Sequence, residues 1–228
     1  MTIPIGIDPA SGKETCIWYN GSFRLTKAQN VRDEIVSIIQ QEGDCLIAWD
    51  APISFSEKSY SDRVVDKITR AWVKSWVDAC CFEKSSINAL PFSGLSHWVI
   101  SCKALGLPFG KIISGLQLFP DSSYSPKSGS HVIEVHPAVA MGCMWLDAKI
   151  EIPFPVHKKT KEARKVIVNE LSFPEICSES DDILDAYVAF LMADMFIENK
   201  SGFVNNPENG SYVLPFGTSY EQIKAKIG

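Results

Sequence analysis

The sequence predicts an α/β fold built on a mixed sheet, and three observations lead to that fold class. Three β-prone runs, residues 3–8, 15–19 and 22–26, precede a stretch with helical periodicity. An apolar run of strand length, residues 45–50, follows that helix, and a strand reached through a helical crossover lies parallel to an earlier strand. A later alternating run, residues 131–137, resumes the strand pattern. We therefore expect three antiparallel strands, then parallel strands, flanked by helices.

Proline, glycine and asparagine residues mark the ends of the N-terminal elements. Pro9 stops the first strand, because proline cannot donate to a sheet ladder. Asn20-Gly21 joins the second and third runs, and this dipeptide between β-prone segments is a strong hairpin signal. Apolar residues recur at helical spacing from Val31 to Ile39, and Gly43 ends the predicted helix.

The middle of the chain predicts a helical insertion within a single domain of residues 1–228. Residues 61–107 carry a helical pattern, and residues 119–130 are rich in Ser and Pro and predict a loop. We place the insertion at about residues 57–130. Its apolar stripe consists of Val65, Ile68, Trp72, Trp76 and Cys80.

The C-terminal part predicts the remaining elements. Pro137 closes the strand at residues 131–137, and two helices follow, near 160–171 and 180–198. Residues 212–214 form a short strand candidate in a tail rich in Gly, Asn and Pro.

The composition bounds the class of protein. The chain has 228 residues, of which 46% are hydrophobic, so it can bury a full core. No apolar run approaches the length of a membrane span, and the N-terminus lacks the features of a signal peptide, so we expect a cytoplasmic protein without membrane contact. Seven scattered cysteines without a Cys-x-x-Cys motif argue against a disulfide framework and against structural zinc.

The charge distribution has two interpretations. A net charge of -5 is unusual for a nucleic-acid binder, because such proteins normally carry a basic surface. The segment from Lys158 to Lys165 is nevertheless densely basic, and it predicts either phosphate contacts or a solvated helix face.

Acidic residues stand at or near the ends of three predicted strands. These residues are Asp8, Asp50 and Glu134, each beside apolar neighbours where an uncompensated charge is costly. A single aspartate after a strand often caps a turn, and that alternative holds for each one taken alone. Three together indicate a shared function.

A second pair of acids opens the last predicted helix. Asp182 and Asp185 are three residues apart and share a helix face, whereas Asp181 and Ser180 suit the first turn and the N-cap. The helix is otherwise apolar and must be largely buried, and its alanines permit close approach to a sheet. Convergent carboxylates suit Mg²⁺ or Mn²⁺, which prefer oxygen ligands. We therefore expect a two-metal type of site.

Several segments together resemble a known family. In order, they are Gly6–Ala10, Ala48–Ile53, Asp66 with Arg70, Ile133–Pro137, Lys158–Thr160, and Asp182 with Asp185 and Ala186. This pattern resembles the domain-of-unknown-function 429 (DUF429) family of predicted ribonuclease H-like nucleases, and the match spans nearly the whole chain.

The resemblance implies a ribonuclease H-like fold related to Holliday-junction resolvases. It implies that Asp8 is the first-strand acid, Asp50 the fourth-strand acid, and Asp182 and Asp185 the pair on the final helix. Glu134 on the fifth strand fits the family pattern. All five are the expected catalytic and metal-binding residues of a hydrolase that cleaves phosphodiester bonds. The expected substrate contacts come from the basic residues Lys158, Lys159 and Arg70. The expected partner is a nucleic acid, with DNA and RNA both open, and the oligomeric state is open too.

Two other function classes fit parts of the sequence. Sugar kinases and actin-like ATPases share this type of first strand, which makes an ATP-dependent phosphotransferase the alternative enzyme. The segment Gly106–Ile112 lacks the spacing of a phosphate loop, and Ser96 lacks the second glycine of a nucleophile elbow. A non-catalytic module that binds nucleic acid or protein through Trp72, Trp76 and Trp98 is the third interpretation. His136 beside Glu134 suits either a base or a structural role.

Overall fold

A mixed sheet forms the centre of the fold. The computed structural model describes residues 2–53, 63–82, 95–106, 116–118, 129–155, 157–206 and 210–227. Among them, six strands form one sheet in the order β3-β2-β1-β4-β6-β5. Their bounds are β1 Ile3–Asp8, β2 Glu14–Tyr19, β3 Ser22–Lys27, β4 Cys45–Trp49, β5 Leu116–Leu118 and β6 Ser130–Glu134.

The pairing confirms the predicted fold class. Strands β1, β2 and β3 are antiparallel, whereas β4 is parallel to β1, β6 to β4, and β5 to β6. An antiparallel meander followed by parallel strands reached through helical crossovers is the α/β arrangement of a ribonuclease H-like fold. The hairpin at Asn20-Gly21 is present, and both residues adopt positive φ, as its turn requires.

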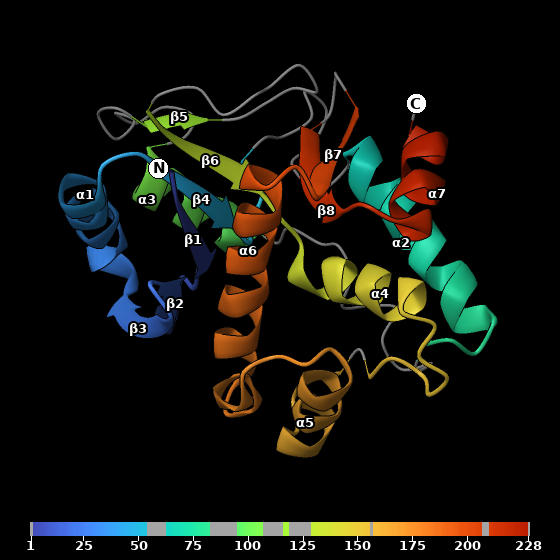
Figure 1. Ribbon diagram of the computed structural model, residues 1–228. Coiled ribbons are helices and arrows are strands. Elements are labelled where there is room, and N and C mark those ends of the chain that lie inside the picture. Colours follow the sequence, from blue (N-terminus) through green and yellow to red (C-terminus); the bar gives the residue numbers. More distant parts are fainter. Residues whose placement is uncertain are drawn as a thin grey trace.

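Helices cover both faces of the sheet (Figure 1). Helices α1 and α3 pack on one face, while α6 crosses the other face in front of β1, with α4 beside it. The helices and short 3-10 turns among the described residues are α1 Val31–Glu42, α2 Val64–Asp78, α3 Leu95–Leu105, α4 Pro137–Asp147, α5 Lys161–Glu170, α6 Asp181–Ile197 and α7 Thr218–Ile227, with η1 Ala28–Asn30 and η3 Glu175–Ser178.

The alternation of side chains along the strands divides the core in two. Ile7, Trp49 and Val132 pack with α1 and α3, whereas Ala48 and Ile133 lie in the core that includes α6. Since successive residues of a strand point to opposite faces, this register fixes which side of the sheet each strand-end residue faces.

Helix α6 approaches β1 closely at Gly6. A Cβ placed on Gly6 would lie 2.7 Å from Cα of Phe190 and closer still to the backbone oxygen of Ala186. The alanines of α6, Ala186, Ala189 and Ala193, are fully buried, as predicted for a helix lying close to a sheet. Small residues on both sides therefore set the depth at which α6 lies on the sheet.

Three elements depart from the sequence prediction: α4, β7 (Ser201–Asn206) and α7. Pro137, expected only to end a strand, occupies the first turn of α4, where its missing N–H costs nothing. Helix α4 is buried nearly all round, so it has no amphipathic period to detect. Strand β8 Gly210–Pro215 confirms the strand candidate at residues 212–214, but its partner β7 and helix α7 were not predicted. These elements pack with α2 and extend the core that includes α6.

The predicted insertion is only partly described. The helical stretch contains two helices, α2 and α3, and β5 adds an edge strand to the sheet from within the expected insertion. The stripe of α2 stops short of Cys80, which is exposed and has a φ of 61°. Residues 119–128 of the predicted loop lie outside the described residues. The insertion boundaries stay a prediction.

Two further observations bear on the composition. All seven cysteines are free, and Cys16, Cys45, Cys143 and Cys177 are buried, as expected for small apolar side chains. No helix in the described part of the chain has both the length and the apolar character needed to cross a membrane.

Candidate functional site

Strands β1 and β4 bring two of the predicted acids side by side. Gly6 pairs with Ala48 and Ile7 with Trp49 in parallel register, and the backbone N–H of Asp50 donates to the Ile7 carbonyl oxygen at 3.0 Å. Because side chains alternate, Asp8 and Asp50 follow Gly6 and Ala48 onto the face that α6 covers. Both are half-buried at the carboxyl ends of their strands.

The start of α6 supplies two more carboxylates. Ser180 caps the helix, since its hydroxyl oxygen accepts a hydrogen bond from Ile183 N at 3.0 Å, as predicted. Asp182 and Asp185 follow one turn apart, with side chains 22% and 16% exposed. The Asp8 and Asp182 carboxyl groups come within hydrogen-bonding range of each other. We call Asp8, Asp50, Asp182 and Asp185 the carboxylate cluster.

The electrostatics confirm that these groups act on one another. Burial, then the charges of Asp50, Asp185 and Asp182, hold the pKa of Asp8 well above its ordinary value. Burial, then the charges of Asp185 and Glu134, likewise raise the pKa of Asp50, while Lys158 opposes the rise. Burial raises the pKa of Asp185, although Lys158 opposes the rise. Close like charges in a partly desolvated place favour either the neutral acids or a cation beside them.

Two lysines supply positive charge to the cluster. Lys158 Nζ forms an ion pair with Asp185, and Lys13 Nζ, from the loop between β1 and β2, forms one with Asp182. Burial would lower the pKa of Lys13, but the hydrogen bond to Asp182 raises it overall.

Glu134 lies in a different environment from the cluster. It pairs with Trp49 across β4 and β6, which puts it on the α1 and α3 side of the sheet. Arg63 Nη2 donates to its Oε1 at 2.6 Å, and Arg63 Nη1 and the N–H of Ile53 donate to Oε2 at 2.7 and 3.0 Å. Burial raises the pKa of Glu134, while Arg63 opposes the rise.

Arg63 joins this carboxylate to a second one. Its Nε and Nη2 donate to Asp66 at 2.8 and 2.9 Å, and Arg63, Asp66 and Glu134 are all nearly inaccessible to solvent. The network ties the loop after Asp50 to the start of α2 and the end of β6. Glu134 is thus bound by Arg63 on the other face of the sheet from Asp8, although its charge still contributes to the raised pKa of Asp50.

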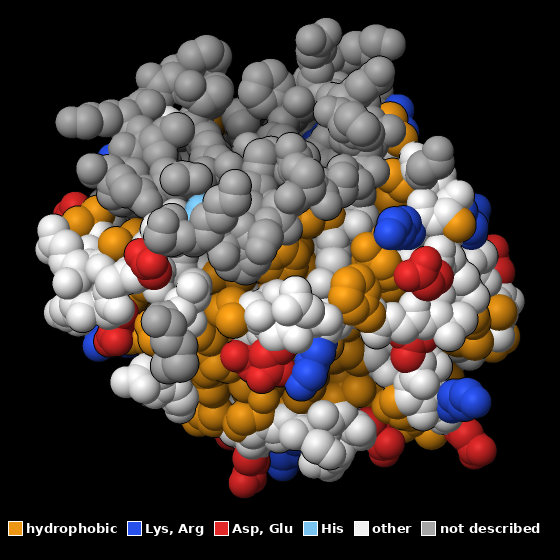
Figure 2. Space-filling view, turned by 45° about the horizontal axis from the view of Figure 1, so that its top comes forward, with side chains coloured by type: hydrophobic (Ala, Val, Ile, Leu, Met, Phe, Trp, Pro, Cys, Tyr) orange, Lys and Arg blue, Asp and Glu red, His pale blue; other side chains and the backbone are white. Residues whose placement is uncertain are grey.

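The predicted substrate-binding residues fall into different settings. Lys158 is largely buried at the cluster, Lys159 is exposed, and Arg70 is half-buried on α2. Arg164, within the basic stretch, is buried and donates to backbone oxygens, so it supports the fold. On the face drawn in Figure 2, the described Lys and Arg side chains lie apart, several beside Asp or Glu, and they form no continuous basic band there.

The donor chemistry of the cluster is that of a hard divalent cation. Its four side chains offer only carboxylate oxygens, the ligands that Mg²⁺ and Mn²⁺ prefer. Among the described residues, however, no three His, Cys, Asp or Glu side chains are placed to hold one metal ion. The residues fit such an ion in their chemistry and charge, while lysine nitrogens lie on two of the carboxylates.

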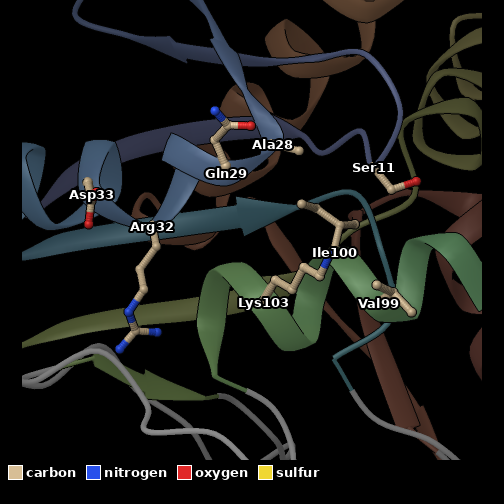
Figure 3. Close-up of a pocket in the computed structure, with 8 residues that line it drawn as sticks. All are labelled: Ser11, Ala28, Gln29, Arg32, Asp33, Val99, Ile100 and Lys103. Carbon is tan, nitrogen blue, oxygen red and sulfur yellow. The ribbon is translucent and has the colours of Figure 1, made fainter.

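A separate pocket of about 430 Å³ lies against α1 and α3 (Figure 3). Arg32 and Lys103 reach it from the two helices, and Ser11 from the loop after β1. The described residues that line this pocket include none of the predicted site residues.

The alternative contact residues are mostly part of the core. Trp72 is 1% exposed, and Trp76 packs edge-on against it at 5.9 Å between ring centroids. The side chains of Ser96 and Trp98 lie outside what the structure describes. His136 stands at the N-cap of α4 and its side chain does not cap the helix.

Sequence reasoning missed Lys13 and Arg63, and it placed Arg164 in a basic stretch without its role of binding backbone oxygens. Each acts through a partner far away in the chain or through backbone oxygens, and no local spacing signals such contacts.

Comparison with known proteins identifies the family. The sequence profile of the family described as "Protein of unknown function (DUF429)" matches residues 6–209, a range that contains the whole carboxylate cluster and both of its lysines. No curated protein and no solved structure matches the chain. The chain belongs to the DUF429 family.

Proposed function

We propose that this protein is a metal-dependent hydrolase of phosphodiester bonds, a nuclease, and that the carboxylate cluster is its active site. One observation carries the proposal. Acids from three separate elements, β1, the end of β4 and α6, meet at the carboxyl ends of two parallel strands and perturb one another electrostatically. Perturbed, convergent carboxylates are typical of catalytic and metal-binding sites.

The proposed ligands of Mg²⁺ or Mn²⁺ are Asp8, Asp50, Asp182 and Asp185. When bound, such an ion supplies positive charge to the attacking and leaving oxygens of a phosphoryl group. The chain itself contributes the orientation of the carboxylates. The backbone bond from Asp50 to Ile7 fixes one strand end against the other, and the Ser180 cap fixes the first turn of α6.

Glu134, also expected as a ligand, fits a supporting role better in this proposal. Both of its carboxylate oxygens accept hydrogen bonds from Arg63 or Ile53, which leaves it as an anchor for the loop that follows Asp50. Its catalytic role stays a prediction.

The proposed substrate is a nucleic acid. Lys158 pairs with Asp185 of the cluster, and the exposed Lys159 follows it in the sequence. Ammonium groups are suited to phosphate oxygens. Arg70 is the third proposed contact. We further propose a cytoplasmic location, where Mg²⁺ and nucleic acids are both abundant.

The test is a cleavage assay of the purified protein. Labelled single-stranded, duplex and branched DNA and RNA are incubated with Mn²⁺, Mg²⁺ or EDTA. We expect cleavage of at least one substrate with metal and none with EDTA. An amide keeps the shape of a carboxylate but removes the charge that holds the cation, so Asp185→Asn should reduce the rate by at least about 100-fold.

A matched control lies on the same helix. Asp194 is half-buried near the other end of α6, where its neighbours are Glu198 and Lys200, and Asp194→Asn should keep the native rate. Cleavage that survives in Asp185→Asn, or falls equally in both variants, would contradict the assignment of the site.

A further inference from the structure

Lys158 is built into the carboxylate cluster as an internal cation. Its side chain is only 12% exposed and its Nζ pairs with Asp185, which is 16% exposed. Its charge also acts on Asp50. A lysine costs side-chain entropy and desolvation when it is held in this way, so a compensating interaction must hold it there.

The backbone of Lys158 is fixed by a buried arginine. Arg164 Nη1 donates to the Lys158 carbonyl oxygen at 2.7 Å, while Nε donates to Ser178 O at 2.9 Å and Nη2 to Glu179 O at 3.0 Å. Ser178 and Glu179 lead directly into the cap of α6. One side chain therefore locks the segment that carries Lys158 to the segment that carries Asp182 and Asp185.

Lys13 makes a similar ion pair with Asp182, but it is more exposed to solvent than Lys158. Its side chain is 59% exposed, and its partner Asp182 is 22% exposed. Because solvent screens exposed ion pairs, this pair is the weaker of the two. The four carboxylates thus face two ammonium groups of unequal strength.

These contacts bear on how a divalent cation would enter. Lys158 and Lys13 each occupy one carboxylate oxygen of the cluster, Oδ1 of Asp185 and Oδ1 of Asp182. A divalent cation bound by the same carboxylates would therefore lie close to both ammonium groups. Two cations cannot share one oxygen lone pair at low cost, because like charges at contact distance repel strongly in a partly buried site.

We propose that Lys158, assisted by Lys13, is a resident cation that offsets part of the cluster's negative charge in the metal-free protein and is displaced when a divalent metal ion binds. This inference rests on the proposed metal site. If the lysines must leave, the measured free energy of metal binding equals the intrinsic binding free energy minus the cost of releasing them. The lysines therefore weaken the affinity for metal and stabilise the empty site.

The test is a direct titration with Mn²⁺ alone, followed by the electron paramagnetic resonance signal of free Mn²⁺. Lys158→Met keeps an unbranched side chain, one atom shorter, and removes its charge, and it should bind Mn²⁺ about tenfold more tightly than the native chain. Lys13→Met should bind about threefold more tightly, because its pair is more exposed. In EDTA, Lys158→Met should also melt at a lower temperature than the native chain.

The matched control is Lys161→Met. Lys161 lies in the same basic stretch, but it pairs with Glu179 at the surface, with side chains 45% and 47% exposed. This variant changes the net charge by the same amount, and it should keep the native Mn²⁺ affinity. Circular dichroism checks the fold of each variant. If Lys158→Met does not fold, the test is whether Lys13→Met binds Mn²⁺ more tightly than Lys161→Met does.

The outcomes separate this inference from the proposed function. If neither the native chain nor Lys158→Met binds Mn²⁺, the metal site is overturned, and the displacement with it. If the native chain binds Mn²⁺ but Lys158→Met and Lys13→Met bind it equally well or more weakly, the displacement alone is overturned. An equal gain of Mn²⁺ affinity in Lys161→Met would mean that net charge alone causes the effect, and this too would overturn the displacement.

Discussion

Replacing Gly6 by alanine tests how α6 is positioned over the site. The added Cβ would lie 2.7 Å from Cα of Phe190, and closer to the Ala186 carbonyl oxygen. Carbon atoms in contact prefer about 3.5 Å, so α6 would have to move away from β1 by at least about 0.8 Å, and by more to clear the Ala186 oxygen. The atoms in the way belong to the backbone, so no side-chain rotation can relieve the clash.

The expected cost follows from the kind of clash. Overpacking of a core costs about 1–3 kcal/mol, and a backbone clash belongs at the upper end, so we expect Gly6→Ala to lose about 3 kcal/mol of unfolding free energy. For a chain of this length, that loss lowers the melting temperature by about 6–12 °C. Urea unfolding and thermal melts in EDTA measure both values.

Gly12→Ala is the matched control in the same part of the chain. A Cβ on Gly12 would have no atom within 4 Å, and we expect a stability change within about 0.5 kcal/mol. If Gly6→Ala and Gly12→Ala had the same melting temperature, the close packing of α6 on β1 would be refuted, along with the geometry that brings Asp185 toward Asp8.

Three further predictions concern charge. Because the folded state raises the pKa of Asp8 and Asp50, it binds protons that the unfolded chain has released, so the cluster destabilises the protein at neutral pH and this penalty fades as the pH falls. The melting temperature of Asp8→Asn in EDTA should therefore exceed that of the native chain at about pH 7.5, with a gap that narrows toward about pH 5; a gap that widens would contradict the sign. Glu134→Gln, which leaves Arg63 short of one buried carboxylate charge, should cost about 3 kcal/mol in urea unfolding, whereas Glu198→Gln at the exposed Lys200 pair should leave the midpoint unchanged. Replacing Lys158, Lys159 and Lys161 together by alanine should weaken nucleic-acid binding in fluorescence anisotropy and make the slope of log K against log salt shallower by about 2–3, and an unchanged slope would favour the solvated-face interpretation.

The sequence was informative wherever one local rule decided the geometry. Asp8 and Asp50 end apolar strand runs, and parallel neighbouring strands present their carboxyl ends at the same edge of a sheet. Asp182 and Asp185 share a helix face by spacing, and the alanines behind them predicted the close approach to β1 that Gly6 completes. These rules were enough to predict the cluster's four aspartates.

The rest depended on contacts between distant parts of the chain. Glu134 ends a strand as Asp50 does, but the register of β6 against β4 turns it to the other face, and register does not follow from the strand's own residues. The pair of Lys13 with Asp182 spans 169 positions, so no periodicity signals it. Helix α4 escaped prediction because burial all round removes the amphipathic pattern.

The central claim is that the carboxylate cluster binds a divalent metal ion, and thermal melts of the native chain and Asp8→Asn with EDTA and with Mn²⁺ test it most directly. A ligand that binds only the folded state at about 100 times its Kd adds about 2.7 kcal/mol. Mn²⁺ at that level should raise the melting temperature of the native chain by about 5–11 °C and should reverse the order seen in EDTA, since Asp8→Asn has lost a ligand charge. A native melting temperature that does not respond to Mn²⁺, or an equal rise in both proteins, would contradict the claim.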